Sequence, residues 1–293
     1  MTIIAILFAF TLSHFIRELS RLRNRQWLED WIRLADERLS GLPGWSDISG
    51  YLVILFVPLL ALGLLNHLVI AGLGNLGAFL LAVAVLIYTF GRRDLDIQVD
   101  DIIQTSDWPE QEQGLRELFR GEVPADPQAC REKTVDAVFS EALHRWFGII
   151  FWFALLGVAG AFLYRMVDWL VSEQTSLTRQ QKALFARTRH VLDWPAAQLM
   201  TLSLAIATDF DSVFTAWKTY HDQQGHGLFE GDNGFLLASA RQVVLSGHAA
   251  RDGYADQLDG PLATLKQTMD LIWRLLGVVL TVLAILLLID VIT

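Results

Sequence analysis

The chain has 293 residues, of which 53% are hydrophobic and 19% charged, whereas soluble globular chains usually carry about 25% charged residues. The formal net charge of −9 argues against a nucleic-acid partner, because proteins that bind nucleic acids present basic surfaces. Cys130 is the single cysteine, so the sequence excludes an internal disulfide and a cysteine-rich metal site.

Long apolar runs predict a helical membrane protein, since a bilayer core of about 30 Å needs about 20 apolar residues per helix. The first run lacks the basic start and the cleavage site of a secretory signal, so we expect a retained span, with an amphipathic surface helix as the alternative. Residues 72–75 turn the chain between the second and third runs. The predicted spans lie near residues 3–16, 51–71, 76–90 and 271–292.

Residues 17–50 carry six arginines, interleaved with Trp27, Trp31 and aliphatic residues at helical spacing. This pattern predicts an amphipathic helix. The helix could lie along the membrane surface with its tryptophans at the headgroup level, or it could pack against the rest of the protein. The sequence leaves both alternatives open.

The run at residues 146–171 is apolar and aromatic, but it is interrupted by Gly157, Gly160, Arg165 and Asp168. Charges inside a span are costly, so the run is either one tilted span or a re-entrant helical hairpin that turns at the glycines. Residues 191–217 are less apolar and carry Asp209 and Asp211 in their interior. We expect this segment to associate with the membrane without crossing it alone.

Lys and Arg flank membrane helices on the cytoplasmic side. The arginines of residues 17–50 and the pair after the third run therefore predict a multi-pass protein of a bacterial inner membrane, with residues 72–75 and both termini outside. The segments expected in the cytoplasm are residues 17–50, 91–145, 172–190 and 218–270. The sequence shows no internal repeat, so it does not favour a transporter built from inverted repeats.

Few motifs with a known chemistry occur. Gly72, Gly74 and Gly77 match the G-x-G-x-x-G dinucleotide fingerprint, but they lie between two predicted spans and not in a βαβ unit, so we interpret them as a turn. The sequence contains no phosphate-binding P-loop and no H-E-x-x-H zinc motif. Nucleotide and metal binding are therefore not predicted from these motifs.

Charged residues at the edges of the apolar runs are the candidates for a binding site. Arg92, Arg93 and Asp94 follow the third run, where paired arginines could bind a phosphate or carboxylate or could simply anchor the helix. Arg165 and Asp168 are three residues apart and could pair on one helix face. Asp193 and Trp194 stand at another apolar boundary, as an interfacial anchor or as site residues.

These segments together resemble a known family. The stretch with Phe151-Trp152, Gly157-x-x-Gly160-Ala161 and Tyr164-Arg165 is similar to the central signature of AmpE, and His190 to Leu199 is similar to the following AmpE block. The resemblance covers most of the chain. It implies an inner-membrane regulatory protein linked to β-lactamase induction and cell-wall recycling.

AmpE is related to CobD/CbiB, the membrane enzymes that attach an aminopropanol arm to adenosylcobyric acid with ATP. Those enzymes carry an acidic element just before the Phe-Trp block, where this chain has Glu141 but also His144 and Arg145. Mg·ATP chemistry uses carboxylates at such a position. The departure favours a regulatory branch, with an ATP- and Mg-dependent amide-forming synthase as the alternative.

We therefore expect an all-α, polytopic helical membrane protein with amphipathic cytoplasmic helices and a re-entrant hairpin, folded as one domain over residues 1–293. We expect it to have no cofactor and no catalytic role. Its partners would be the bilayer and an anionic small molecule such as a nucleotide, a lipid phosphate or a cell-wall fragment. The candidate ligand-binding residues are Arg92, Arg93, Asp94, Glu141, Trp152, Tyr164, Arg165, Asp168, Asp193 and Trp194.

Overall fold

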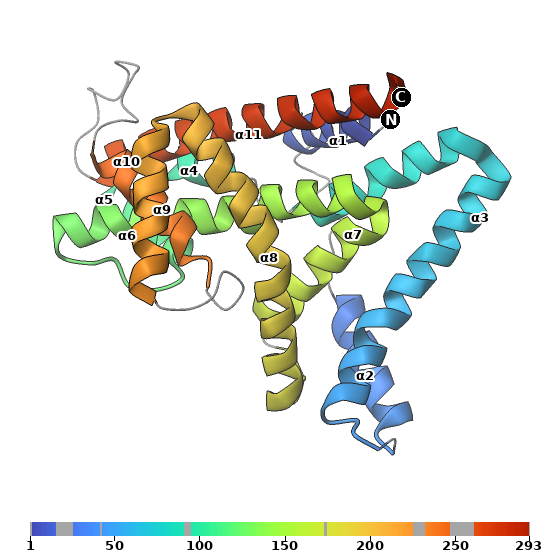
Figure 1. Cartoon of the computed structure of the whole chain (residues 1–293). Helices are drawn as coiled ribbons and strands as arrows, with labels where there is room; N and C mark the ends of the chain where they lie inside the picture. Colours follow the sequence, from blue (N-terminus) through green and yellow to red (C-terminus); the bar gives the residue numbers. More distant parts are fainter. Residues whose placement is uncertain are drawn as a thin grey trace. The chain divides into compact units, whose positions relative to one another are not determined.

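The computed structural model describes residues 2–15, 26–41, 43–90, 95–172, 175–224, 232–246 and 261–292. Within these ranges all regular structure is helical, which confirms the predicted all-α class (Figure 1). The helices are α1 (Thr2–Phe15), α2 (Gln26–Leu39), α3 (Ile48–Thr89), α4 (Leu95–Gln104), α5 (Trp108–Phe119), α6 (Pro127–Ala142), the π-helical η2 (Leu143–Phe147), α7 (Gly148–Ser172), α8 (Arg179–Ala207), α9 (Phe210–Gln224), α10 (Gly234–Leu245) and α11 (Pro261–Ile292).

Three helical stretches of the described chain are long and apolar enough to cross a membrane: Ile48–Thr89, Pro127–Ser172 and Leu262–Leu286. They support the prediction of a membrane protein. The apolar part of α1, Ile3–Leu12, is shorter. The 14 residues of α1 rise about 21 Å, less than a bilayer core of about 30 Å. The number of crossings stays a prediction.

The chain forms two compact units. The first comprises Met1–Arg92 and Gly148–Asp193, and the second comprises Arg93–Phe147 and Trp194–Thr293. The expectation of one domain over residues 1–293 stays a prediction.

Two long helices of the first unit double back at a glycine (Figure 1). α3 breaks at Gly74, inside the turn predicted at residues 72–75, so the expected spans 51–71 and 76–90 are its two arms. α7 breaks at Gly157, as expected for the hairpin alternative of residues 146–171. Glycine is required at these positions because both residues have a positive φ.

The amphipathic helix predicted in residues 17–50 is α2, which begins at Gln26, and residues 17–25 lie outside the described residues. Its apolar side, Leu28, Ile32 and Ala35, is buried. Trp27 stacks on Phe162 of α7 with ring centroids 6.0 Å apart. These contacts match the alternative in which the helix packs against the protein.

The beginning of α3 packs against the first half of α8. Tyr51 and Thr188 share a hydrogen bond of 2.8 Å between their hydroxyls, and the Tyr51 ring lies 4.8 Å from that of Phe185. Gln181 donates a 2.8 Å hydrogen bond from Nε2 to the carbonyl oxygen of Trp45. The first turns of α3 are therefore surrounded by polar helices of the same unit.

In the second unit, α6 packs against α10 and α11. Val135, Val138 and Phe139 are fully buried in this core. Arg241 of α10 forms a bidentate ion pair with Asp136 of α6. This hydrogen-bonded pairing raises the pKa of the Arg241 guanidinium, so the charge is held at any ordinary pH.

Residues 191–217 do not form one continuous helix. α8 ends at Ala207 and α9 begins at Phe210. The carboxylate of Asp209 accepts a 3.0 Å hydrogen bond from the backbone N–H of Ser212. An aspartate that caps a helix start in this way separates two helices, and the segment is not among the stretches able to span a membrane.

Candidate functional site

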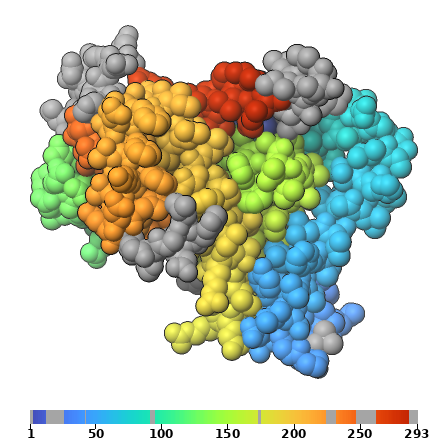
Figure 2. Space-filling model, viewed as in Figure 1, coloured from blue at the N-terminus to red at the C-terminus, as the bar shows by residue number. Residues whose placement is uncertain are grey.

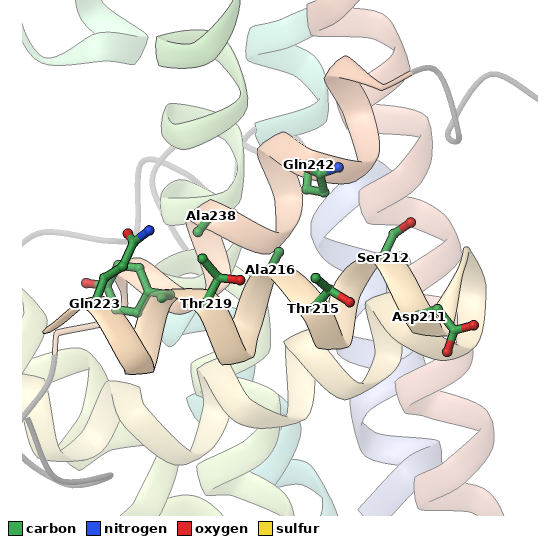
Figure 3. A pocket seen from close by; sticks show the side chains of 9 residues that line it. Asp211, Ser212, Thr215, Ala216, Thr219, Gln223, Ala238 and Gln242 are labelled. Atoms are coloured by element: carbon green, nitrogen blue, oxygen red, sulfur yellow. The ribbon is translucent and has the colours of Figure 1, made fainter. Parts of the chain in front are cut away.

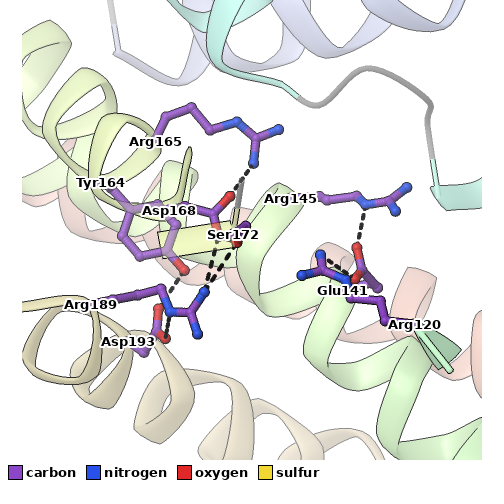
Figure 4. A network of polar contacts seen from close by, with 9 residues as sticks. All are labelled: Arg120, Glu141, Arg145, Tyr164, Arg165, Asp168, Ser172, Arg189 and Asp193. Atoms are coloured by element: carbon purple, nitrogen blue, oxygen red, sulfur yellow. Dashed lines mark hydrogen bonds and ion pairs between the residues drawn. The ribbon is translucent and has the colours of Figure 1, made fainter. Parts of the chain in front are cut away.

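A buried polar cluster lies on the second arm of α7, within the first unit (Figure 4). Arg165 and Asp168 are one helical turn apart, and Nη1 of Arg165 lies 3.0 Å from Oδ2 of Asp168. Only 4% and 6% of these residues are exposed. The pairing suggested by their spacing is therefore present, in a setting where either charge alone would be costly.

The cluster continues from α7 to α8. The Tyr164 hydroxyl donates a 2.7 Å hydrogen bond to Oδ1 of Asp193. Arg189 donates a 3.1 Å hydrogen bond to Oγ of Ser172, and its guanidinium lies 3.8 Å from Asp168 and 4.0 Å from Asp193. Arg189 thus bridges both carboxylates.

Two features of the α7 hairpin position Tyr164. A Cβ at Gly148 would overlap the ring of Tyr164, so the first arm must carry glycine there for the ring to fit. Trp152, on the same arm, donates a 2.9 Å hydrogen bond from Nε1 to the carbonyl oxygen of Leu192, next to Asp193. The hairpin and α8 therefore meet around the tyrosine.

Arg165 and Arg189 face Asp168 and Asp193 in this cluster. Arg189 is its most accessible charged group, with 26% of its side chain exposed. An arginine can hold a phosphate or carboxylate through two parallel N–H donors. An anion that approaches from the exposed side would therefore meet Arg189 first.

Glu141 belongs to a different cluster, in the second unit. Its Oε2 lies 2.6 Å from Nε of Arg145, and its Oε1 lies 2.6 Å from Nη2 of Arg120. The Glu141 side chain is 6% exposed, and Arg145 also donates a hydrogen bond to Gln98. Both oxygens of this carboxylate are occupied by arginines.

The other four predicted site residues do not belong to either cluster or are not described. Arg92, Arg93 and Asp94 lie outside the described residues. Trp194 is half-buried beside Asp193 on α8. Of the predicted site residues, Trp152, Tyr164, Arg165, Asp168 and Asp193 come together in the first unit.

Sequence reasoning missed Arg189, Ser172 and Arg120. Arg189 stands four residues before Asp193, and that spacing on a helix is a signal for an ion pair. Ser172 stands four residues after Asp168 and donates a 3.2 Å hydrogen bond to it. Arg120 carried no such signal, because it is far from Glu141 in the sequence.

A polar groove of about 480 Å³ lies between α9 and α10 in the second unit (Figure 3). Hydroxyl and amide side chains such as Thr215, Thr219 and Gln242 line it, and none of the predicted site residues that the structure describes does. Tyr220 borders it, and burial together with a hydrogen bond to Asp232 raises the pKa of this phenol to about 12. No group of three metal-ligating side chains occurs among the described residues.

Comparisons with known proteins give one family. No curated protein and no solved structure matches the chain significantly. The family of CobD/Cbib proteins matches residues 6–288, which is nearly the whole chain and includes both polar clusters. The chain therefore belongs to the CobD/CbiB family.

Proposed function

We propose that this protein is a regulatory member of the CobD/CbiB family, similar to AmpE, in a bacterial inner membrane. In this role it would report a cell-wall or envelope state and contribute to β-lactamase induction. The observation that carries the proposal is the state of Glu141, whose two oxygens are held by Arg120 and Arg145. A carboxylate bound in this way is poorly disposed to ligate Mg²⁺, which prefers free carboxylate oxygens.

The ligand of this regulator would be a small anion that binds at the cluster around Arg189. Two arginines and a tyrosine hydroxyl lie together there, and one guanidinium reaches the surface. Phosphates and carboxylates are the groups that arginine binds best. A nucleotide, a lipid phosphate and an anionic cell-wall fragment all share this chemistry.

The alternative is an ATP-dependent amide-forming synthase, and the family match over residues 6–288 favours it. In that case Mg²⁺ and ATP would have to displace one arginine from Glu141. The synthase alternative therefore predicts Mg²⁺-dependent nucleotide binding that is lost in Glu141→Gln.

A titration of the detergent-purified protein with Mg·ATP distinguishes the regulatory proposal from the synthase alternative. The regulatory proposal expects no saturable Mg²⁺-dependent binding, or binding that Glu141→Gln leaves unchanged. Saturable binding lost in Glu141→Gln would overturn the proposal in favour of the synthase. The double variant Arg165→Ala, Asp168→Ala is titrated in the same way, which shows whether any Mg·ATP binding depends on the cluster in the first unit.

A cellular assay tests the regulatory role directly. In a strain that lacks its own copy, β-lactamase activity after exposure to a β-lactam should depend on the wild-type protein. The Arg189→Ala variant should lower this induction, and Lys218→Ala, an exposed residue of α9, should not. Equal induction with and without the protein would contradict the proposal.

A further inference from the structure

Two segments of the first unit, 83 residues apart, share their sequence. Residues 71–80 and residues 154–163 are identical at seven of ten positions, in the pattern A-x-L-G-x-x-G-A-F-L. Each segment forms the turn of a helix that doubles back, α3 in the first case and α7 in the second. This corrects the expectation that the chain has no internal repeat.

The backbone takes the same path in both turns. Gly74 has φ 60° and ψ −148°, and Gly157 has φ 63° and ψ −147°. This conformation is essentially restricted to glycine. Among the described residues, no other atom lies within 4 Å of the position of a Cβ at either glycine, so the conformation alone demands glycine at both places.

The second glycine of each segment makes the same close approach. A Cβ at Gly77 would lie 2.6 Å from Cβ of Leu73, and a Cβ at Gly160 would lie 2.7 Å from Cβ of Leu156. In both cases it would also crowd the carbonyl oxygen eight residues earlier. The two arms of each hairpin therefore meet in the same way.

The second arm of each hairpin is short for a bilayer, whereas the first arm of α3, residues 48–73, rises about 39 Å. The second arms, residues 75–89 and 158–172, each have 15 residues and rise about 22 Å, against a bilayer core of about 30 Å. Tyr51 and Ile54 of the first arm of α3 contact α8 and α2. Its part from Phe56 to Leu73, which is mostly apolar but contains Asn66 and the exposed His67, rises about 27 Å.

Both turns present apolar side chains and no charge. Residues 48–91 contain no Asp, Glu, Lys or Arg. Leu73 and Leu156, which are equivalent in the two segments, are 67% and 52% exposed. α3 lies at the surface in Figure 2, coloured from blue to teal. Asn75 is the polar residue of the first turn and is exposed.

We propose that the chain contains two copies of one membrane hairpin, and that both turns lie among the lipid acyl chains without reaching water on the far side. The short second arms, the uncharged turns and the exposed leucines at both turns lead to this conclusion. It concerns the bilayer as a partner and does not depend on the ligand proposed above.

Labelling of the two equivalent leucines tests the proposal. The full chain carries one cysteine, Cys130, which is buried, so Cys130→Ser gives a background for Leu73→Cys and Leu156→Cys. Each variant is reconstituted in sealed vesicles of phosphatidylethanolamine and phosphatidylglycerol, and Glu110→Cys on the exposed side of α5 is the water-accessible control. A membrane-impermeant maleimide is added to either face, and nitroxide labels report collisions with oxygen and with a water-soluble nickel complex.

Both turn positions should react at least about tenfold more slowly than Glu110→Cys from either face, because water is excluded from the acyl region. Their nitroxides should collide more with oxygen than with nickel. Labelling from one face at the control rate would overturn the proposal for that hairpin. Low collision rates with both reagents would also overturn it, since protein and not lipid would then cover the turn.

A second measurement needs no substitution. In the wild-type protein in lipid nanodiscs, the backbone amides of residues 73–77 and 156–160 should exchange with deuterium more slowly than those at the break between α8 and α9. Exchange as fast as at that break would place the turns in water and contradict the proposal.

Discussion

Tyr164 and Asp193 join two helices of the first unit, because the tyrosine hydroxyl donates a 2.7 Å hydrogen bond to the aspartate carboxylate. Both side chains are buried. Asp193 lies one turn after Arg189, which also reaches Asp168. This bond therefore fixes the position of the α8 charges relative to those of α7.

Tyr164→Phe should lower the free energy of unfolding by about 1–3 kcal/mol, because it removes a hydrogen-bond donor from a buried carboxylate. Thermal unfolding in detergent, followed by circular dichroism, measures the change. Tyr51→Phe is the matched control. It removes a half-buried bond between two neutral hydroxyls and should cost about 1 kcal/mol or less. If Tyr164→Phe and Tyr51→Phe lost the same unfolding free energy, the charged acceptor Asp193 would add nothing to the Tyr164 hydrogen bond.

Arg165→Ala should cost about 3–5 kcal/mol of stability, since it removes the nearer of two arginines that pair with the buried carboxylate of Asp168. The double variant with Asp168→Ala should lose less than the sum of the single losses. A double-mutant cycle of unfolding free energies measures this coupling. The exposed Lys266–Asp270 pair of α11 is the control, with a coupling of about 0.3–0.5 kcal/mol expected.

Gly157→Ala and Gly160→Ala should both destabilise the α7 hairpin, but for different reasons. The first forces a Cβ into a backbone conformation that glycine alone adopts easily, at about 1–3 kcal/mol. The second pushes a Cβ against the carbonyl oxygen of Trp152. Gly277→Ala on α11, where a Cβ meets no described atom within 4 Å, is the control and should be neutral or slightly stabilising. Melting temperatures of the three variants provide the comparison.

The phenol of Tyr220 should titrate near pH 12, and this can be followed by its absorbance as phenolate. Burial is the first cause and the hydrogen bond to Asp232 the second, so Asp232→Asn should lower the pKa without returning it to 10. The folded-state pKa is raised, so the associated stability is present below about pH 10 and is lost as the pH rises through 12. An unchanged pKa in Asp232→Asn would contradict the assigned partner.

Local sequence signals predicted the features that depend on nearby residues. The glycines at 72–77 and 157–160 marked both helix breaks, because only glycine tolerates their backbone angles. The spacing of Arg165 and Asp168 predicted their pairing. Glycine conformation and helical periodicity are local properties, so they can be read without knowledge of the fold.

Contacts between distant segments could not be predicted in the same way. Arg120 reaches Glu141 only because α5 and α6 pack together. The break at residues 208–209 depends on the Asp209 cap inside a run whose composition still favoured one apolar segment. The duplicated turn was not predicted. Both copies lie within long apolar runs, and the similar composition of those runs masks the identity of the two ten-residue segments.

The duplication supplies an internal reference for the polar cluster. Leu81, Ala82 and Val85 occupy, in the second arm of α3, the places that Tyr164, Arg165 and Asp168 occupy in α7. At these three positions, the α7 hairpin therefore has polar or charged side chains and the α3 hairpin has aliphatic ones. Swapping these three residues between the two copies would show how much a polar site lowers the stability of a membrane hairpin, with both hairpins in the same molecule.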